Sequence, residues 1–287
     1  MSSIALATSA ILLLNGAATA NTADAAPGPR FPLPSLGSLL QEEVEEPEDK
    51  GWTGFIEAGV SASGGNTKRF DAETKIQAKR EWERNSVAVY GRAEYGEAEQ
   101  TMTFTDPNGV ITRSTTTERN VNRQTAGGRF DHELDDIWYL FAKEDLTRDE
   151  FKDIKIRSET FGGAGRDLYK SERSLLTAEV GIGYSYTSFY DEGRERGVSG
   201  LLGEKYETRL NAQWELVQTL DFVSNLQEID DDFRSTFVVE VRSDLTETVY
   251  LSFGFEHRYD SEPARDNNGD RSDRQDYKVT VKLGYRF

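Results

Sequence analysis

Alternation of apolar and polar residues runs from Gly51 to the end of the chain and constrains the fold more than any other feature. In the final segment one parity carries apolar or aromatic residues and the other does not: Tyr277, Val279, Val281, Leu283, Tyr285 and Phe287 against Lys278, Thr280, Lys282, Gly284 and Arg286. Successive side chains of a β-strand point to opposite faces, whereas an amphipathic helix repeats every three to four residues. The pattern therefore predicts an all-β fold.

Twelve alternating segments can be counted, and most have ten residues or more: 52–62, 68–82, 86–97, 118–130, 137–148, 154–168, 174–190, 203–216, 219–227, 234–243, 247–259 and 276–287. A tilted strand of about ten residues spans the apolar layer of a bilayer. An even number of antiparallel strands lets a barrel close with both ends on one side. We expect residues 51–287 to form an antiparallel up-and-down transmembrane β-barrel of about twelve strands, with short periplasmic turns and longer extracellular loops.

The connections and the aromatic residues agree with this architecture. Short turns are expected at the periplasmic rim, at 83–85, 131–136, 170–173, 217–218 and 244–246, and long loops at the other rim, at 98–117, 191–202 and 260–275. Aromatic girdles mark both interfaces of membrane barrels. The expected architecture places four tryptophans in the periplasmic girdle: Trp52, Trp82, Trp138 and Trp214. It places five tyrosines in the outer girdle: Tyr95, Tyr190, Tyr206, Tyr259 and Tyr277.

The first 50 residues lack the alternation and fall into two parts. Residues 4–14 are apolar but too short to span a bilayer, and small-x-small sites end at Ala20 and Ala25. This is typical of a secretory signal peptide over 1–25, cleaved after Ala20 or Ala25, although no Lys or Arg precedes the apolar stretch. A buried helix is the alternative. Residues 26–50, rich in Pro and then in acids, are expected to form a disordered periplasmic linker.

Composition excludes several functional classes. The 34 Lys and Arg residues against 51 Asp and Glu give a net charge of −17, which argues against nucleic-acid binding. The chain has no Cys and two His, His132 in an expected periplasmic turn and His257 on the expected lipid face. A His- or Cys-based zinc site is therefore not expected. No G-x-S-x-G motif frames a nucleophile, so we expect no enzymatic activity, no catalytic residue and no cofactor.

The face opposite the apolar one carries dense charge of both signs, which cannot face hydrocarbon and is predicted to fill the lumen. The predicted lumen charges are Glu57, Asp71, Glu73, Lys75, Lys79, Arg92, Glu94, Glu207, Arg209, Glu256, Lys278, Lys282 and Arg286. Two interpretations are open: opposite charges pair and plug a narrow barrel, or they line a water-filled path for solutes. Because selectivity rings are usually of one sign, the mixed signs favour the plug.

An oxygen-rich loop offers weak candidates for metal ligands, namely Asp266, Asn268, Asp270 and Asp273. Such loops can hold Ca²⁺, but this one lacks the Glu at the twelfth position of an EF-hand, and Arg271 and Arg274 intrude. A solvated acidic loop is the favoured interpretation.

Several motifs, in order along the chain, resemble those of the salt-induced outer-membrane protein family (YdiY-like), a domain family of unknown function. They are G-W-x-G at 51–54, S-x-G-N-T at 63–67, FGGAGRDLYKSERSLLTAEVGIGYSY at 161–186, E-x-R-Y-D-S-E-P at 256–263 and a terminal G-Y-R-F. The resemblance implies an outer-membrane location in a Gram-negative envelope and an association with salt or envelope stress. It supplies no catalytic residues.

The closing Phe287 resembles the C-terminal signal of outer-membrane barrels. The expected partners are therefore outer-membrane lipid, lipopolysaccharide and the barrel assembly machinery. The alternative function is a porin-like channel for small solutes. An outer-membrane enzyme and a soluble periplasmic β-barrel are weaker alternatives.

Overall fold

The computed structural model describes residues 50–64, 69–105, 111–190, 193–227, 232–263 and 274–287. The expected signal peptide, most of the expected linker and the four oxygen-rich loop residues at 266–273 lie outside these ranges. The strands are β1 (Lys50–Gly64), β2 (Arg69–Trp82), β3 (Asn85–Thr105), β4 (Ile111–Glu133), β5 (Trp138–Asp149), β6 (Ile154–Lys170), β7 (Ser174–Phe189), β8 (Arg194–Arg209), β9 (Trp214–Asn225), β10 (Phe233–Asp244), β11 (Val249–Asp260) and β12 (Gln275–Arg286).

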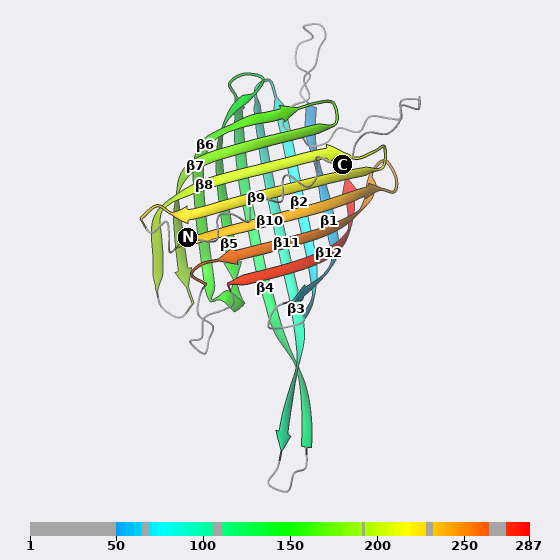
Figure 1. Cartoon of the computed structure of the whole chain (residues 1–287), viewed down its shortest axis with the longest axis vertical. Helices are drawn as coiled ribbons and strands as arrows, with labels where there is room; N and C mark the ends of the chain where they lie inside the picture. Colours follow the sequence, from blue (N-terminus) through cyan, green and yellow to red (C-terminus); the bar gives the residue numbers. More distant parts are fainter. Residues whose placement is uncertain (1–49, 65–68, 106–110, 191–192, 228–231, 264–273) are drawn as a thin grey trace. The chain divides into compact units, whose positions relative to one another are not determined.

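These strands close into one antiparallel barrel in which each strand pairs with its neighbours in sequence and β1 pairs with β12 (Figure 1). The closing seam runs from Phe55 opposite Arg286 to Gly64 opposite Tyr277. Beyond it, Gly54 and Phe287 exchange two backbone hydrogen bonds of 2.9 and 3.0 Å. A closed sheet leaves no unpaired edge in an apolar medium. The predicted up-and-down barrel of twelve strands is confirmed.

The two parities of each strand face opposite environments, as the alternation predicted. On β1 the inward Glu57 is fully buried, whereas the outward Ile56 and Val60 are 44% and 42% exposed. On β12 the inward Lys282 is 5% exposed and the outward Leu283 54%. The outer wall is thus apolar and the interior polar, which is the reverse of a water-soluble protein and the arrangement of a transmembrane barrel.

In four of the turns at one rim, a side-chain oxygen accepts hydrogen bonds from backbone N–H groups of the same turn. Asp135 accepts hydrogen bonds from the backbone N–H groups two and three residues further on, and Ser171, Asn211 and Thr246 do the same in their turns. Asx and Ser/Thr side chains mimic a backbone turn in this way. We call this end of the barrel the tryptophan rim and the opposite end the loop rim. The connections at the tryptophan rim lie at 83–84, 134–137, 171–173, 210–213 and 245–248.

The boundary between β8 and β9 differs from the prediction. The sequence predicted strands at 203–216 and 219–227 with a turn at 217–218, but β8 begins at Arg194 and the turn lies at 210–213. The predicted long loop at 191–202 is therefore mostly strand. The prediction was wrong because the parity of Tyr206 to Leu216 continues unbroken through the turn, which hides it from a period-two count.

The predicted loop at 98–117 is also mostly strand, because β3 and β4 continue to Thr105 and from Ile111. Past Glu97 on β3 the pairing with β2 ends, so the two strands pair only with each other and leave the barrel wall as a ribbon (Figure 1). A two-stranded ribbon outside the wall has no lipid-facing side, so its sequence needs no apolar parity. The alternation that marks a barrel strand is accordingly absent there.

Inward aromatic residues lie directly opposite inward glycines on the next strand. The five pairs are Tyr90–Gly127, Tyr139–Gly165, Phe141–Gly163, Phe161–Gly183 and Tyr250–Gly284. A Cβ on any of these glycines would overlap the opposite ring. The glycines therefore let the rings lie flat on the barrel wall, where Tyr139, Phe141, Phe161 and Leu201 form the one buried apolar cluster of the described residues.

Within the described ranges, no helix has the length and apolar character needed to cross a membrane.

Candidate functional site

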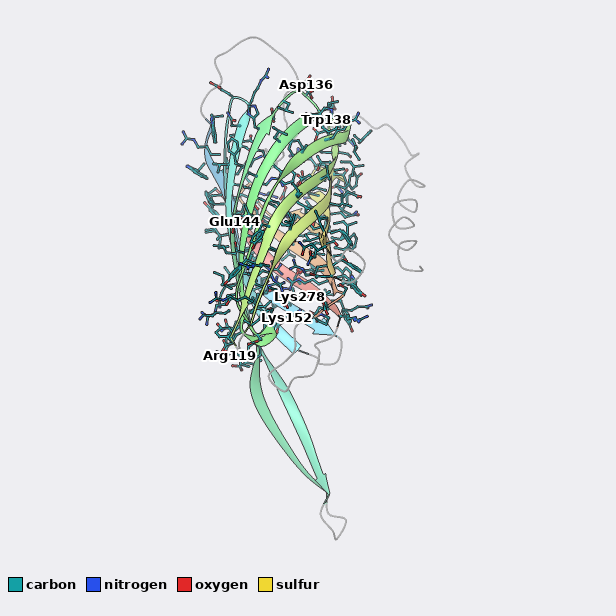
Figure 2. The ribbon with its side chains drawn as sticks, turned by 90° about the vertical axis from the view of Figure 1, so that its left-hand side faces the viewer. Arg119, Asp136, Trp138, Glu144, Lys152 and Lys278 are labelled. Carbon is teal, nitrogen blue, oxygen red and sulfur yellow. The ribbon has the colours of Figure 1, made fainter. Side chains whose placement is uncertain are left out.

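The inward charges of β12 form a ladder of ion pairs from one rim to the other. Asp276, Lys278, Lys282 and Arg286 all occupy the inward parity of this strand, and we call these four residues the β12 ladder. At the loop rim Asp276 pairs with Lys152, 2.8 Å away on the short helix η3 (Glu150–Lys152) that follows β5. Lys152 and Lys278 both lie toward the end opposite Asp136 and Trp138 (Figure 2).

Lys278 belongs to a network of six charges. Its Nζ lies 2.7 Å from Glu73 and also contacts Glu94. The guanidinium of Arg92 lies 3.0 Å from Glu73, 2.9 Å from Glu94 and 2.9 Å from Glu256. Arg258 pairs with Glu256 and lies 3.8 Å from Glu94. We call these six residues the central network.

The central network crosses the lumen. Arg92 and Glu94 lie on β3 and Glu256 and Arg258 on β11, and these strands are separated by β2, β1 and β12. The side chains that meet therefore reach past three intervening strands. The four carboxylate and ammonium groups of Glu73, Glu94, Glu256 and Lys278 are buried in spite of their charge. Buried charges of this density are tolerated only when each has partners of opposite sign.

Lys282, one step further along the ladder, connects three strands. Its Nζ lies 2.8 Å from Glu57 on β1 and 3.4 Å from Glu240 on β10. The hydroxyls of Tyr250 and Ser252 donate to Glu57 and Glu240, each over 2.7 Å. The contact between Lys282 and Glu57 has the distance of an ion pair but lacks the alignment of a hydrogen bond, since Glu57 Oε2 has no hydrogen-bond donor.

Gly59 gives Lys282 the room to do this. Gly59 lies opposite Lys282 on the inward parity of β1, and a Cβ there would lie 2.6 Å from Lys282 Cγ. A larger residue at position 59 would also overlap the backbone of β12, because its Cβ would lie 2.2 Å from the carbonyl oxygen of Val281. Gly59 therefore leaves the space that the Lys282 side chain occupies in the lumen.

Arg286 completes the ladder at the tryptophan rim. Its guanidinium lies 2.6 Å from Asp244 and 3.9 Å from Glu215, and it stacks over the ring of Tyr250 with 4.3 Å to the centroid. Planar guanidinium groups favour this combination of carboxylate pairing and ring stacking. Tyr250 therefore packs against Gly284 and also stacks with the guanidinium of Arg286.

A second charged cluster spans the opposite part of the lumen. Arg129 on β4 lies 2.6 Å from Glu179 on β7 and 2.7 Å from Asp131, and Tyr139 donates to Glu179 over 2.7 Å. Arg234 on β10 lies 2.5 Å from Glu159 on β6. The strands joined by Arg234 and Glu159 have β7, β8 and β9 between them. This pair, like the central network, reaches across the lumen.

The thirteen predicted lumen charges all occupy inward parities, but they do not form one cluster. Nine are buried, while Lys75, Arg92, Arg209 and Arg286 are half-buried. Lys75 lies over the ring of Phe55, Lys79 contacts Glu81, and Glu207 pairs with Lys205 at 2.7 Å. Asp71 and Arg209 lie apart from the ladder, on β2 and at the end of β8.

The ion pairs of Glu256 and Lys278 extend beyond neighbouring strands. The two residues are directly opposite each other on β11 and β12. Yet Lys278 pairs with Glu73 and Glu94, and Glu256 pairs with Arg92 and Arg258. A strand-to-strand register does not decide such partners, because long side chains can cross an intervening strand.

Sequence reasoning missed several members of the site: Arg129, Glu159, Glu179, Arg234, Glu240, Arg242, Tyr250 and Arg258. Their signal was present, because each lies on the inward parity of its strand. Arg242 is an example, since it lies 2.8 Å from Glu240 and stacks over Phe55 and Tyr250. Extending the parity count to every strand would have found them.

The girdle residues separate by rim. Trp52 and Trp82 lie at the tryptophan-rim ends of β1 and β2, and Trp138 and Trp214 open β5 and β9 at that same rim. All four are between 36% and 48% exposed. Tyr190, Tyr259 and Tyr277 lie at the loop rim, as does Tyr95 at the point where β3 leaves the wall.

Tyr206 and His132 are placed differently from the prediction. Tyr206 lies three residues from the end of β8 and belongs to the tryptophan-rim half, because β8 begins earlier than predicted. His132 lies in β4 rather than in a turn, with its Nδ1 2.9 Å from Asn85 Oδ1.

His257 occupies the outward parity of β11, opposite Phe237 and Tyr277. No cluster of three potential metal ligands occurs among the residues described.

Comparison with known proteins identifies the family. The model of a family described as "Protein of unknown function, DUF481" matches residues 56–287, which is nearly the whole barrel. The chain belongs to this family. It is also 24% identical to "Uncharacterized protein YdiY" of Escherichia coli (strain K12) over 241 residues, covering 82% of this chain and 83% of that protein. The predicted resemblance to the YdiY-like proteins is confirmed.

Several solved structures are similar to this chain at low sequence identity. The NanC porin is 10% identical with a TM-score of 0.49, covering 80% of this chain and 98% of that one. The KdgM porin is 7% identical with a TM-score of 0.46, covering 81% and 99%. The translocator domain of the autotransporter NalP from Neisseria meningitidis is 13% identical with a TM-score of 0.45, covering 82% and 88%.

Proposed function

We propose that this family member is an outer-membrane barrel without enzymatic activity whose lumen is closed by ion pairs. Three features suit a chain that spans a bilayer. They are the apolar outer wall, the aromatic residues at both rims and the closed hydrogen-bonded seam. Among bacterial membranes, such barrels belong to the outer one. Lipid and lipopolysaccharide are then its surroundings, and Phe287, which seals the seam against Gly54, is the residue that the assembly machinery would read.

The crossing of the lumen by the central network carries the proposal. Arg92 holds Glu256 from a strand four positions away, and Arg234 holds Glu159 at the same separation. Lys152 and Asp276 add a further bridge at the loop rim. Each bridge occupies volume through which a solute would have to pass. Opening a path would break buried ion pairs, which costs several kcal/mol per uncompensated charge.

The absence of catalysis is part of the proposal. Nucleophilic catalysis by serine requires a base within hydrogen-bond reach. Of the two His, His132 lies close to Asn85, and His257 faces outward among Phe237 and Tyr277. The association with salt or envelope stress rests on the family resemblance, and measuring the protein's abundance at several salt concentrations would test it.

A porin-like channel is the second candidate. It is favoured by a cavity of about 230 Å³ inside the loop rim and by the polar character of the whole interior. The two candidates differ in what happens to the ion pairs: in a channel they are solvated and exchange partners, and in a plug they hold the lumen shut.

Planar-bilayer conductance of the purified protein decides between them. The unmodified protein should show no steady conductance. Replacing the six residues of the central network and the two further bridges, Lys152–Asp276 and Arg234–Glu159, by Ser removes five positive and five negative charges together and should open a conducting path. The matched control is Arg148→Gln, because Arg148 is exposed and bonds to Tyr190 rather than to the network.

The contrary result is equally clear. Steady conductance from the unmodified protein, with ion selectivity altered by Lys282→Glu and unfolding unchanged, would overturn the plug and establish the channel.

A further inference from the structure

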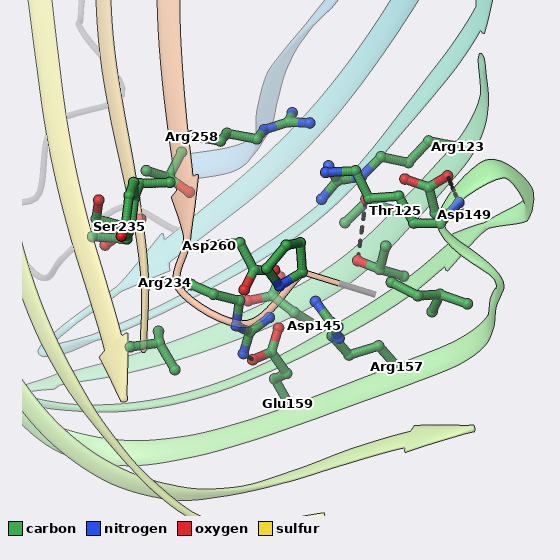
Figure 3. Close-up of a pocket in the computed structure, with 18 of the residues that line it drawn as sticks. Arg123, Thr125, Asp145, Asp149, Arg157, Glu159, Arg234, Ser235, Arg258 and Asp260 are labelled. Atoms are coloured by element: carbon green, nitrogen blue, oxygen red, sulfur yellow. Dashed lines mark hydrogen bonds and ion pairs between the residues drawn. The ribbon is translucent and has the colours of Figure 1, made fainter. Parts of the chain in front are cut away.

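A cavity of about 230 Å³ lies inside the loop rim, among residues of β4, β5, β6, β9, β10 and β11. Its lining is rich in charge, with six cations and five carboxylates. Figure 3 shows Arg123, Arg157, Arg234, Arg258, Glu159 and Asp260 among them. A volume of this size equals about seven to eight water molecules. It can hold a small solute but not a polymer.

Most of the carboxylates in this lining already have partners. Glu159 holds Arg234 at 2.5 Å, and Asp145 accepts from the Tyr90 hydroxyl and lies 3.8 Å from Lys143. Asp149 accepts the backbone N–H groups of Phe151 and Lys152, each over 3.2 Å. The remaining two are Asp260, which accepts the N–H of Glu262 over 3.1 Å, and Asp221, which interacts with Lys143.

Two of the cations lack a carboxylate partner. Lys152, Arg234 and Arg258 pair with Asp276, Glu159 and Glu256. No carboxylate of the described residues lies within ion-pair distance of Arg123 or Arg157. Arg157 donates its Nε to Thr187 over 3.1 Å, which leaves its two terminal nitrogens available. Arg123 makes no hydrogen bond through its side chain to any described residue.

The two free guanidinium groups are close enough to repel one another. Arg157 is also repelled by Arg234, and although Glu159 and Asp260 attract it, neither of them forms an ion pair with it. Holding two like charges away from bulk water without an ion-paired counterion is unfavourable. An anion bound between them would remove that cost. Guanidinium groups bind carboxylate and phosphate oxygens through paired N–H donors, which fits these two groups in particular.

We propose that this cavity binds a small dissolved anion, carrying a carboxylate or phosphate group, between Arg123 and Arg157. The ligand arrives through water rather than from lipid, because the residues that line the cavity occupy inward parities of the barrel wall. The cavity shares Glu159, Arg234 and Arg258 with the ion pairs of the proposed function. Arg123 and Arg157 belong to none of those pairs, so an anion can bind between them whether or not the lumen is closed.

Isothermal titration calorimetry of the purified barrel in a neutral detergent at low salt tests the site. Inorganic phosphate and succinate should bind, whereas glucose and choline should not. Arg123→Gln and Arg157→Gln should each weaken anion binding at least about tenfold, because each removes charge-assisted hydrogen bonds. Arg196→Gln is the matched control, since Arg196 is exposed at the loop-rim end of β8 on the outward parity. It should bind as the unmodified protein does.

Heat-modifiable gel mobility confirms that each variant is folded before titration. If Arg157→Gln does not fold, Arg123→Gln decides, because Arg123 holds no described side chain in place. No binding of either anion to the unmodified protein overturns the proposal, as does equal binding by Arg123→Gln and Arg196→Gln. Dihexanoyl phosphatidylglycerol should bind no more tightly than glycerol 3-phosphate. Tighter binding would identify a lipid headgroup as the ligand and overturn the assignment to a dissolved solute.

Discussion

The Nζ of Lys282 on β12 lies 2.8 Å from Oε2 of Glu57 on β1, inside the seam that closes the barrel. Glu57 is fully buried and Lys282 nearly so. The first and last strands are therefore joined twice, by the backbone hydrogen bonds of the sheet and by a buried charge pair. The seam joins the first and last strands, so it can form only when all twelve strands are present. The pair therefore stabilises the closed barrel and not a partly formed sheet.

Breaking this pair on one side should be costly. Lys282→Met leaves the buried Glu57 carboxylate without its cation and should lower the free energy of unfolding by about 3–5 kcal/mol. The double variant Lys282→Met with Glu57→Gln should recover part of that loss, because no buried charge at Glu57 then remains. Urea-induced unfolding in lipid vesicles measures both. A double variant no more stable than the single one would show that the pair is solvated.

The glycines opposite the inward rings should resist substitution. Gly165→Ala places a methyl group within the ring of Tyr139, which is 4% exposed and cannot retreat, and should destabilise by about 1–3 kcal/mol. Gly162→Ala on the same strand is the control, because its Cβ would approach nothing closer than 3.9 Å and should change stability by less than about 0.5 kcal/mol. Similar losses in both would count against ring packing as the cause.

The outward facing of β12 can be tested at Val281. This residue is 39% exposed on the outer wall, and Val281→Arg should cost about 2–4 kcal/mol if it lies near the middle of the bilayer. Val281→Leu keeps the apolar surface and should cost less than about 1.5 kcal/mol. Folding yield and unfolding in vesicles provide the measurement. Tolerance of arginine at this position would mean that the outer wall does not face hydrocarbon.

The gathering of the tryptophans at one rim makes a fluorescence prediction. All four lie at the same end of the barrel, so lipids brominated near the headgroup should quench their emission more than lipids brominated at the chain ends. A protein with V281W as its sole tryptophan should show the opposite order. Stronger quenching of the native tryptophans by the deep bromines would place this rim inside the apolar layer.

Processing of the chain is the prediction that depends on sequence alone. The mature protein should begin at Asn21 or Ala26, directly after one of the two small-x-small sites. N-terminal sequencing of the protein from the membrane fraction checks this. A mature chain that retains Met1 would contradict export by a cleaved signal peptide.

The candidate site was predictable in kind but not in its contacts. Parity placed Glu57, Lys278 and Lys282 in the lumen, and the structure finds them there. Parity could not give the partners of Lys278, because Glu73 and Glu94 lie across β1, beyond any strand that pairs with β12. Such contacts depend on barrel curvature and on side-chain length.

The sequences of the turns contain information that a count of alternating residues does not use. The hidden turn between β8 and β9 contains Asn211, whose side chain accepts from the N–H of Gln213 and Trp214. Asp135, Ser171 and Thr246 stand at the equivalent positions of three other turns. A search for Asx, Ser or Thr three residues before a strand would have placed this boundary, because such side chains stabilise turns by accepting backbone hydrogen bonds.

The sequence by itself determined the number of strands and which parity faces lipid, though not every strand boundary, because a barrel wall between lipid and lumen forces one parity to be apolar and the other polar along each crossing. Only the tertiary structure decided whether the inward charges would line an opening or meet. Their meeting depends on closure: once β1 pairs with β12, Arg92 and Glu256 lie within 2.9 Å although 164 residues separate them in the chain. The same closure leaves Arg123 and Arg157 without carboxylate partners among the described residues, which no count of charges along the chain could reveal.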